Sequence, residues 1–205
     1  MTEKILTAIK EVKEKSKKRN VNQSFDLIIN LKHLDTKKAE SRINEVFTLP
    51  NSRGKDSTIA LFSDTIKDAD CEILKSSDIE KLAADKRAVK NFAKKIDFSL
   101  SEPKLMPVVG KALGQFLAPR GKMPKIVVGN VNSMIKNYKK SIRIKVKDSP
   151  VIHCSIGSEK LEDEKIAENI NAVLDFLLTK LPKGKQNIRS VFIKLTMGKP
   201  VKIEV

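Results

Sequence analysis

Cysteine and histidine are scarce in this 205-residue chain, which has two of each. Cys71, Cys154, His33 and His153 show neither C-x-x-C nor closely paired histidine spacing. Because a structural zinc site needs four clustered ligands, the sequence predicts no metal site. Two separated cysteines also give no disulfide framework, and they are typical of a protein that works in a reducing compartment.

Aromatic side chains make up only 4% of the chain, with eight Phe, one Tyr and no Trp. Proteins that hold single-stranded bases on aromatic platforms need several exposed rings in a row. The K/R-G-F/Y-G/A-F-V pattern that marks one such platform is absent. Any RNA or DNA binding by this chain must therefore rest on charge, backbone amides and shape.

Long apolar runs are missing as well. No stretch approaches the roughly 18 consecutive apolar residues that a membrane span requires. The first residues, 1–6, include an acidic side chain and lack the apolar core of a signal peptide. The sequence therefore predicts a cytoplasmic protein without a membrane segment.

What the chain has in excess is positive charge. It carries 41 Lys and Arg against 25 Asp and Glu, a net charge of +16. An excess of this size is more than solubility requires. It favours a polyanionic partner, with nucleic acid as the first candidate and an anionic membrane surface as the second.

The first segment of the chain has the pattern of a helix followed by strands. Residues 3–18 have apolar side chains at helical spacing, and their basic residues gather at the C-terminal end, where cations suit the helix dipole. Residues 25–31 alternate as in a half-buried strand, and residues 42–48 are predicted to be its partner. The turn-rich stretch 50–56 closes this segment.

The middle segment has a different pattern. Residues 58–62 are continuously apolar, as in a parallel strand that is covered on both faces. Further strands are predicted at 96–100, 127–128 and 141–147, with helices at 77–84, 86–95, 103–117 and 131–139. Strands that alternate with helices predict a small α/β domain with a mostly parallel sheet.

The final segment returns to the pattern of the first. It is predicted to hold strands at 151–156, 188–196 and 200–205 and a helix at 162–181. The simplest architecture is a split α+β domain, made of residues 1–56 and 150–205, with an α/β domain of residues 57–149 inserted. Since net charges of +7 and +9 fall on these two domains, the excess lies on folded surfaces and favours structured nucleic acid.

Motifs for catalysis or nucleotide binding are weak. Gly110 and Gly114 lack the Lys-Ser/Thr of a phosphate loop. Asp64, Asp68 and Asp70 lack the Gly and distal Glu of a calcium loop and are interpreted as helix-start and solvent charges. Nothing nominates an enzyme. A nucleotide-binding enzyme that uses the α/β domain stays as the alternative, and a DNA-binding regulator as a third.

Two loops concentrate functional residue types. Residues 118–125 alternate three cations with Pro and Gly, which is typical either of a phosphate-contacting loop or of a solvated loop between helices. Residues 194–200 end one strand and begin another. There Thr196 offers a hydroxyl, Met197 a flexible apolar side chain, and Gly198 a positive φ or a close backbone approach to a ligand. An ordinary hairpin turn is the alternative.

These two loops, Ala118–Lys125 and Leu195–Gly198, resemble signature stretches of the L-one family of large-subunit ribosomal proteins, the stalk proteins, of archaeal type. The likeness covers nearly the whole chain and extends through Gln23–Ile28, Arg53–Lys55, Leu105–Pro107 and Asp163–Leu174. It implies a split two-layer α+β domain with an antiparallel sheet and a hinged, inserted Rossmann-like α/β domain. It also implies a structural protein without catalysis or cofactor.

The same resemblance implies the partners. The first domain is expected to bind large-subunit ribosomal RNA at the base of the mobile stalk, and the stalk to assist release of exit-site tRNA. Many family members also repress translation by binding a mimic of that RNA site in their own-operon mRNA. The chain is expected to be a monomer off the ribosome, to be cytoplasmic and to bind no membrane.

Position by position, the resemblance also assigns RNA contacts. The expected RNA-binding residues are Asn20, Val21, Ser24, Asp26, Ser190, Thr196, Met197 and Gly198. Expected secondary phosphate contacts are Arg53, Lys55, Arg120, Lys122 and Lys125. Asp26 would accept a hydrogen bond from a 2′-OH or a base amine, or else serve as a salt-bridge or sheet-edge charge. Family members usually have Phe at Val21 and Gly at Ala118, so contact area and turn geometry are expected to differ there.

Overall fold

The structure is a computed structural model that describes residues 2–17, 19–34, 43–66, 69–147 and 149–203. The chain divides into two compact units. Residues 1–55 and 140–205 form what we call the split unit, and residues 56–139 form the inserted unit. Segments from the beginning and from the end of the chain thus belong to one body, and the fold is mixed α/β, as expected from the sequence.

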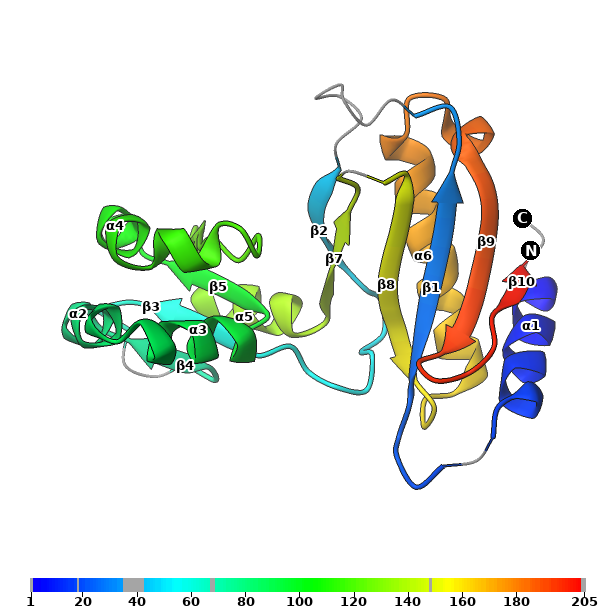
Figure 1. The fold of residues 1–205 in the computed structure, drawn as a ribbon, viewed down its shortest axis with the longest axis horizontal. Helices are drawn as coiled ribbons and strands as arrows, with labels where there is room; N and C mark the ends of the chain where they lie inside the picture. Colours follow the sequence, from blue (N-terminus) through cyan, green and yellow to red (C-terminus); the bar gives the residue numbers. More distant parts are fainter. Residues whose placement is uncertain (1, 18, 35–42, 67–68, 148, 204–205) are drawn as a thin grey trace. The chain divides into compact units, whose positions relative to one another are not determined.

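The split unit is built on a four-stranded antiparallel sheet. Its central strands are β1 (Ser24–Leu31) and β9 (Ile188–Leu195), flanked by β8 (Val151–Ser158) and β10 (Val201–Ile203). Strands from the first and last segments of the chain therefore lie side by side (Figure 1). The alternation seen in residues 25–31 arises because every second side chain of β1 points into the core.

Two helices cover one face of this sheet. They are α1 (Thr2–Lys15) and α6 (Asp163–Lys180), and Figure 1 shows α6 behind the strands. Their apolar stripes pack on the inward side chains of β1, β8 and β9 in one hydrophobic core. A short 3₁₀ helix, Gly184–Asn187, joins α6 to β9. The outward side chains of the three strands are half-buried or exposed, so this face stays open.

The boundary expected at residue 150 differs from the structure. Residues 141–147 were assigned to the inserted domain, but β7 (Ser141–Lys145) pairs antiparallel with β2 (Asn44–Thr48) in the split unit. The N–H of Leu49 also donates to the carbonyl of Lys140 (3.3 Å). Because the boundary lies elsewhere, the net charges of the two units also differ from those expected. The split unit has 26 basic and 15 acidic residues, a net charge of +11, and the inserted unit has 15 basic and 10 acidic residues, a net charge of +5.

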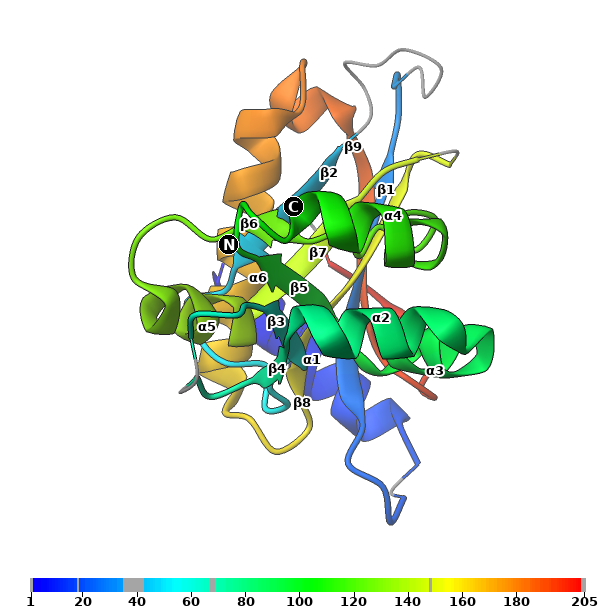
Figure 2. The ribbon, with the colours of Figure 1, turned by 90° about the vertical axis from the view of Figure 1, so that its left-hand side faces the viewer.

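The inserted unit has a parallel sheet in the order β4-β3-β5-β6. These strands span Glu72–Leu74 (β4), Ile59–Phe62 (β3), Phe98–Ser101 (β5) and Lys125–Ile126 (β6). The helices are α2 (Ser76–Ala84), α3 (Lys86–Lys95), α4 (Met106–Leu117) and α5 (Val131–Lys139). In Figure 2, α5 lies on one side of the sheet and α2, α3 and α4 on the other. All four residues of β3 are buried, as expected for a strand covered on both faces.

The two ends of the inserted unit lie next to each other. The N–H of Ser57 donates to the carbonyl of Lys139 (3.1 Å). Lys139 also forms an ion pair with Asp70. Asp64 accepts a hydrogen bond from the N–H of Ser76, as a helix-start charge does (2.9 Å), and Asp68 lies outside the described residues. Within the described ranges, no helix is long and apolar enough to cross a membrane, and no three His, Cys, Asp or Glu side chains gather as a metal site would need.

Candidate nucleic-acid interface

The open face of the split unit's sheet carries charged, polar and apolar side chains in neighbouring positions. Strand register places Asp26 between Ser155 on β8 and Lys194 on β9. It places Ile28 between His153 and Phe192, two positions further along. Because the neighbouring residues of each strand point into the core, these side chains share one face. A mixture of this kind suits hydrogen bonding and charge more than base stacking.

The turn of residues 196–198 is fixed to the start of β1. The N–H and the hydroxyl of Thr196 both donate to the carbonyl of Ser24 (3.0 and 3.1 Å). The N–H of Met197 donates to the side-chain oxygen of Gln23, which is buried (3.2 Å). Thus the sequence-predicted residues Ser24, Thr196 and Met197 meet. We call residues 19–24 and 196–199 the corner.

Two apolar side chains of the corner reach into solvent. Met197 is 67% exposed and Val21 is 69% exposed. Their exposure is unusual for large apolar residues of the described chain, which are mostly buried, and it leaves both free to contact a partner. Asn20, which precedes Val21, is exposed as well.

Gly198 serves a close approach, but not the one expected from the sequence. Its φ is not in the left-handed region, so a positive φ does not explain it. A Cβ at this position would lie 2.6 Å from the hydroxyl oxygen of Ser16, at the end of α1. The glycine therefore lets the turn pack closely against the residue that follows α1.

Basic side chains surround the corner. A groove of about 220 Å³ is lined by Lys15, Lys17, Arg19 and Lys199 together with Met197. The guanidinium of Arg19 lies 3.1 Å from the sulfur of Met197. A second groove, of about 400 Å³, contains residues 19–22 together with Glu159 and Lys160. The exposed apolar residues thus stand among cations, an arrangement that fits a polyanion with apolar sugar and base faces.

Asp26 lies in a shallow hollow of about 370 Å³ on the open face, together with Ile28, His153 and Lys194. Partial burial raises the pKa of its carboxyl, while the neighbouring side chain of Thr196 and the positive charge of Lys194 act in the opposite direction. A carboxylate at this place can accept hydrogen bonds, and it lies next to the ammonium of Lys194 and the imidazole of His153. Sequence reasoning missed His153 and Lys194, although both occupy outward positions of strands it predicted.

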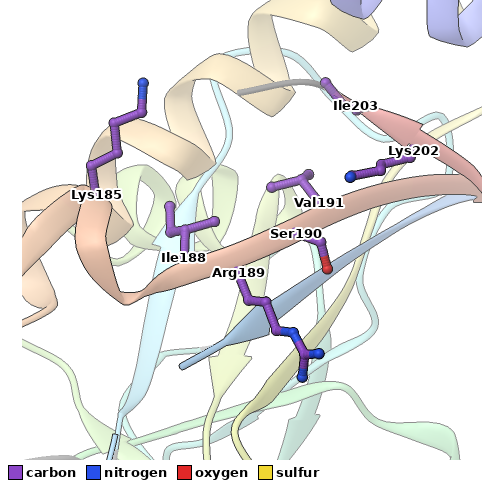
Figure 3. Close-up of a pocket in the computed structure, with 7 residues that line it drawn as sticks. All are labelled: Lys185, Ile188, Arg189, Ser190, Val191, Lys202 and Ile203. Carbon is purple, nitrogen blue, oxygen red and sulfur yellow. The ribbon is translucent and has the colours of Figure 1, made fainter. Parts of the chain in front are cut away.

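Ser190 shares the open face but lies far from the corner. It is six residues from Thr196 along β9, which corresponds to about 20 Å. Its hydroxyl accepts a hydrogen bond from the side-chain amide of Asn30 (3.0 Å). Figure 3 shows Ser190 and Arg189 on one side of β9 and Val191 on the other. The groove here, of about 270 Å³, also contains Lys185 and Lys202.

The loop with Arg53 and Lys55 lies at the same end of the sheet as the corner. Gly54 has a φ of +81°, and a Cβ on it would lie 2.4 Å from the hydroxyl oxygen of Ser158. Ser158 is opposite Ser24 in the β1–β8 register. The structure therefore brings this loop to the start of β1, where Lys55 is exposed.

The cations of residues 118–125 belong to the inserted unit. The ammonium of Lys122 donates to the carbonyls of Ala93 and Ile96 (3.0 and 2.5 Å), where α3 ends. Lys122 thus has a structural contact that the expectation of a phosphate contact did not foresee. Arg120 and Lys125 are exposed, and the ammonium of Lys125 lies 6.0 Å from the ring centroid of Tyr138.

Fold and site together define a class of protein. A split two-layer α+β unit carries a Rossmann-like insertion, its open sheet face ends in a basic corner, and the described residues hold no His, Cys, Asp and Glu cluster of the kind that binds a metal ion. These features fit the class of proteins whose basic surfaces face a polyanion.

Comparison with known proteins names the family. The model of the ribosomal protein L1p/L10e family matches residues 12–199. Large ribosomal subunit protein uL1 of Pyrococcus horikoshii is 40% identical over 210 residues, which cover 98% of this chain and 96% of that protein. Its counterpart in Methanobrevibacter smithii is 41% identical over 211 residues, covering 99% of this chain and 100% of that protein.

This chain belongs to the ribosomal protein L1p/L10e family, and the resemblance predicted from its motifs is confirmed, including the archaeal character of its relatives. With the family comes the class of structural, non-enzymatic proteins of the ribosome. The alternative of a nucleotide-binding enzyme is therefore set aside.

Proposed function

We propose that this protein is a constituent of the large ribosomal subunit of cytoplasmic ribosomes and that its split unit binds large-subunit ribosomal RNA. One observation supports the location of the RNA-binding site at the corner. The turn of residues 196–198 is held by hydrogen bonds to Ser24 and Gln23 and packs closely against Ser16, and it presents Met197 to solvent among cations. A rigid turn of this kind reads the shape of a folded RNA.

Each expected contact has a chemical role in this proposal. The hydroxyls of Ser24 and Thr196 and the backbone of Gly198 bind ribose and phosphate, while Met197 and Val21 pack on a ribose or base face. Asp26 accepts a hydrogen bond from a 2′-OH, which distinguishes RNA from DNA. The same face extends the interface through Lys194 towards Ser190, and Arg53 and Lys55 extend it past the start of β1.

Electrostatic attraction is proposed to supply most of the free energy of binding. The split unit carries +11 and few aromatic side chains, so affinity comes from phosphate neutralisation and not from base stacking. The logarithm of the binding constant should then fall linearly with the logarithm of the salt concentration. A flat salt response would contradict this interface.

The decisive experiment replaces Met197 by Asp and measures binding to a ribosomal stalk RNA fragment. Full burial of a Met side chain is worth about 1.5–3 kcal/mol, and two-thirds of Met197 is available for burial. The loss of that contact, together with a carboxylate facing phosphate, should weaken binding at least tenfold.

A matched control separates the site from general charge effects. Val128 is 77% exposed and lies in the inserted unit, so Val128→Asp makes the same change of charge at another exposed apolar position. It should leave affinity almost unchanged. Equal loss in both variants, or no loss in Met197→Asp, would refute the site. Duplex DNA at the same salt concentration should compete poorly.

Three finer functions are also proposed on the strength of the family resemblance. They are assistance in exit-site tRNA release, repression of translation through own-operon mRNA, and secondary phosphate contacts by Arg120 and Lys125 of the inserted unit. A translation extract that lacks this protein tests the first two. Added protein should accelerate tRNA release, and it should reduce synthesis from a messenger only when that messenger carries the stalk-like RNA structure.

A further inference from the structure

The inserted unit has a feature that the proposed RNA binding does not explain. It lies where the order of the strands in the sheet reverses, between β3 and β5. Strand β4 lies on one side of β3, and β5 lies on its other side with β6 beyond it. In open α/β sheets, ligands bind outside the carboxyl ends of two such strands. Here the residues at that place are Ser63–Ile66, after β3, and Glu102, after β5.

Hydrogen-bond donors converge on Glu102 at this place. The hydroxyl of Ser63 donates to Oε1 of Glu102 (2.5 Å), and the hydroxyl of Thr65 donates to the same oxygen. The backbone groups of Asp64 and Thr65 also bond the carboxylate. These four bonds hold the pKa of Glu102 below its ordinary value. The loop therefore binds an anion, and the anion is a side chain of the protein itself.

The loop is held in shape by bonds that do not involve the Glu102 side chain. The N–H of Ser63 donates to the carbonyl of Leu74 (3.1 Å), and the Ser63 hydroxyl oxygen accepts from the N–H of Ile66 (2.8 Å). Asp64 accepts from the N–H of Ser76 (2.9 Å). The donors would consequently keep their positions if the carboxylate were removed. Asp64 is the charge that opposes an external anion here, so weak binding is expected.

We propose that residues 63–66 form a phosphate-binding site that Glu102 keeps filled. The carboxylate occupies the donors that a phosphate group would use and repels a second anion. The chain thus has the crevice of a nucleotide-binding fold but excludes nucleotides by its own side chain. Removal of that side chain should create a site for inorganic phosphate or for the terminal phosphate of a nucleotide.

The test uses the full chain and titrates inorganic phosphate, followed by the amide resonances of residues 63–66 in two-dimensional NMR. Glu102→Ala should show saturable shifts of these amides, whereas the native protein should show none. Glu80→Ala is the matched control, because it removes one exposed negative charge from the same unit. Titration of AMP in place of phosphate distinguishes a free phosphate site from a nucleotide site.

Saturable binding to the native protein, or no shifts in a folded Glu102→Ala, would overturn the proposal. A measurement on the native protein decides the case in which that variant does not fold. The amide resonances of Asp64 and Thr65 should shift as Glu102 is protonated, at a pH below the ordinary glutamate pKa of 4.5. Titration of Glu102 without any response of these amides would also overturn it. Since the site lies in the inserted unit, neither result affects the proposed RNA interface.

Discussion

Replacing Asn169 by Ala should destabilise the split unit and leave the inserted unit unchanged. Asn169 lies on α6 and is fully buried. Its side-chain oxygen accepts from the N–H of Asn51 (3.0 Å), and its amide nitrogen donates to the carbonyls of Ile156 (2.8 Å) and Asn51 (3.3 Å). One side chain therefore connects the first segment of the chain to β8 and α6 of the last.

The expected magnitude follows from these three bonds. A typical hydrogen bond contributes about 1 kcal/mol, and a buried group left without its partner costs about as much or more. Asn169→Ala should thus lower the free energy of unfolding by about 3 kcal/mol. For a protein of this length, that corresponds to a fall in Tm of about 6–12 °C. The control Asp175→Ala, at an exposed position of the same helix, should stay within about 0.5 kcal/mol.

The assay can observe the two units separately. The chain has no Trp, and its single Tyr, Tyr138, lies in the inserted unit. Urea unfolding followed by tyrosine fluorescence therefore reports that unit, whereas far-UV circular dichroism reports both. Asn169→Ala should move the split unit's part of the circular-dichroism transition to lower urea concentration and leave the fluorescence transition in place. A loss below about 1 kcal/mol, or an equal shift of the fluorescence curve, would refute the reasoning that Asn169 joins the two chain segments.

Three further predictions concern single side chains. Lys122→Met should cost the inserted unit about 1–3 kcal/mol, seen in tyrosine-monitored unfolding, because two carbonyls at the end of α3 lose their donor; unchanged stability would contradict that role. Val21→Phe should tighten binding to the stalk RNA about fivefold, since added apolar area at an exposed contact is worth about 1 kcal/mol; weaker binding would count against Val21 as a contact. Asp26→Asn should raise Tm at pH 7, and the gain should shrink on acidification, because a carboxyl whose pKa is raised by folding destabilises the fold fully above the raised pKa and not at all below the pKa of the unfolded chain; a gain that is constant with pH would exclude this cause.

Most elements of the fold could be predicted because their patterns are local. The stripe of α6 and the alternation of β1 each reflect one covered face, and the structure has both. By contrast, β4 was not predicted, since three residues are too few to show a period. The pairing of β2 with β7 could not be predicted either. Alternation identifies a strand, but it does not identify the distant strand that pairs with it.

The candidate site stays a prediction, although the structure brings several of its residues together. Residue types alone left Thr196 and Met197 compatible with an ordinary hairpin turn, and the family resemblance of residues 195–198 is what assigned them to an RNA contact. His153 and Lys194 gave no such signal, because single polar residues on an outward strand position are common. The contact of Lys122 with the end of α3 joins residues 26 and 29 positions apart, and only the folded chain shows it.

The adjacent ends of the inserted unit, joined by the Ser57–Lys139 hydrogen bond, have an evolutionary consequence. An insertion whose two ends meet adds little loop-closure entropy to its host, whatever its length. Mutations, insertions and deletions within the inserted unit are therefore tolerated without strain on the sheet of the split unit. Natural selection can accordingly alter one body of this molecule at a different pace from the other.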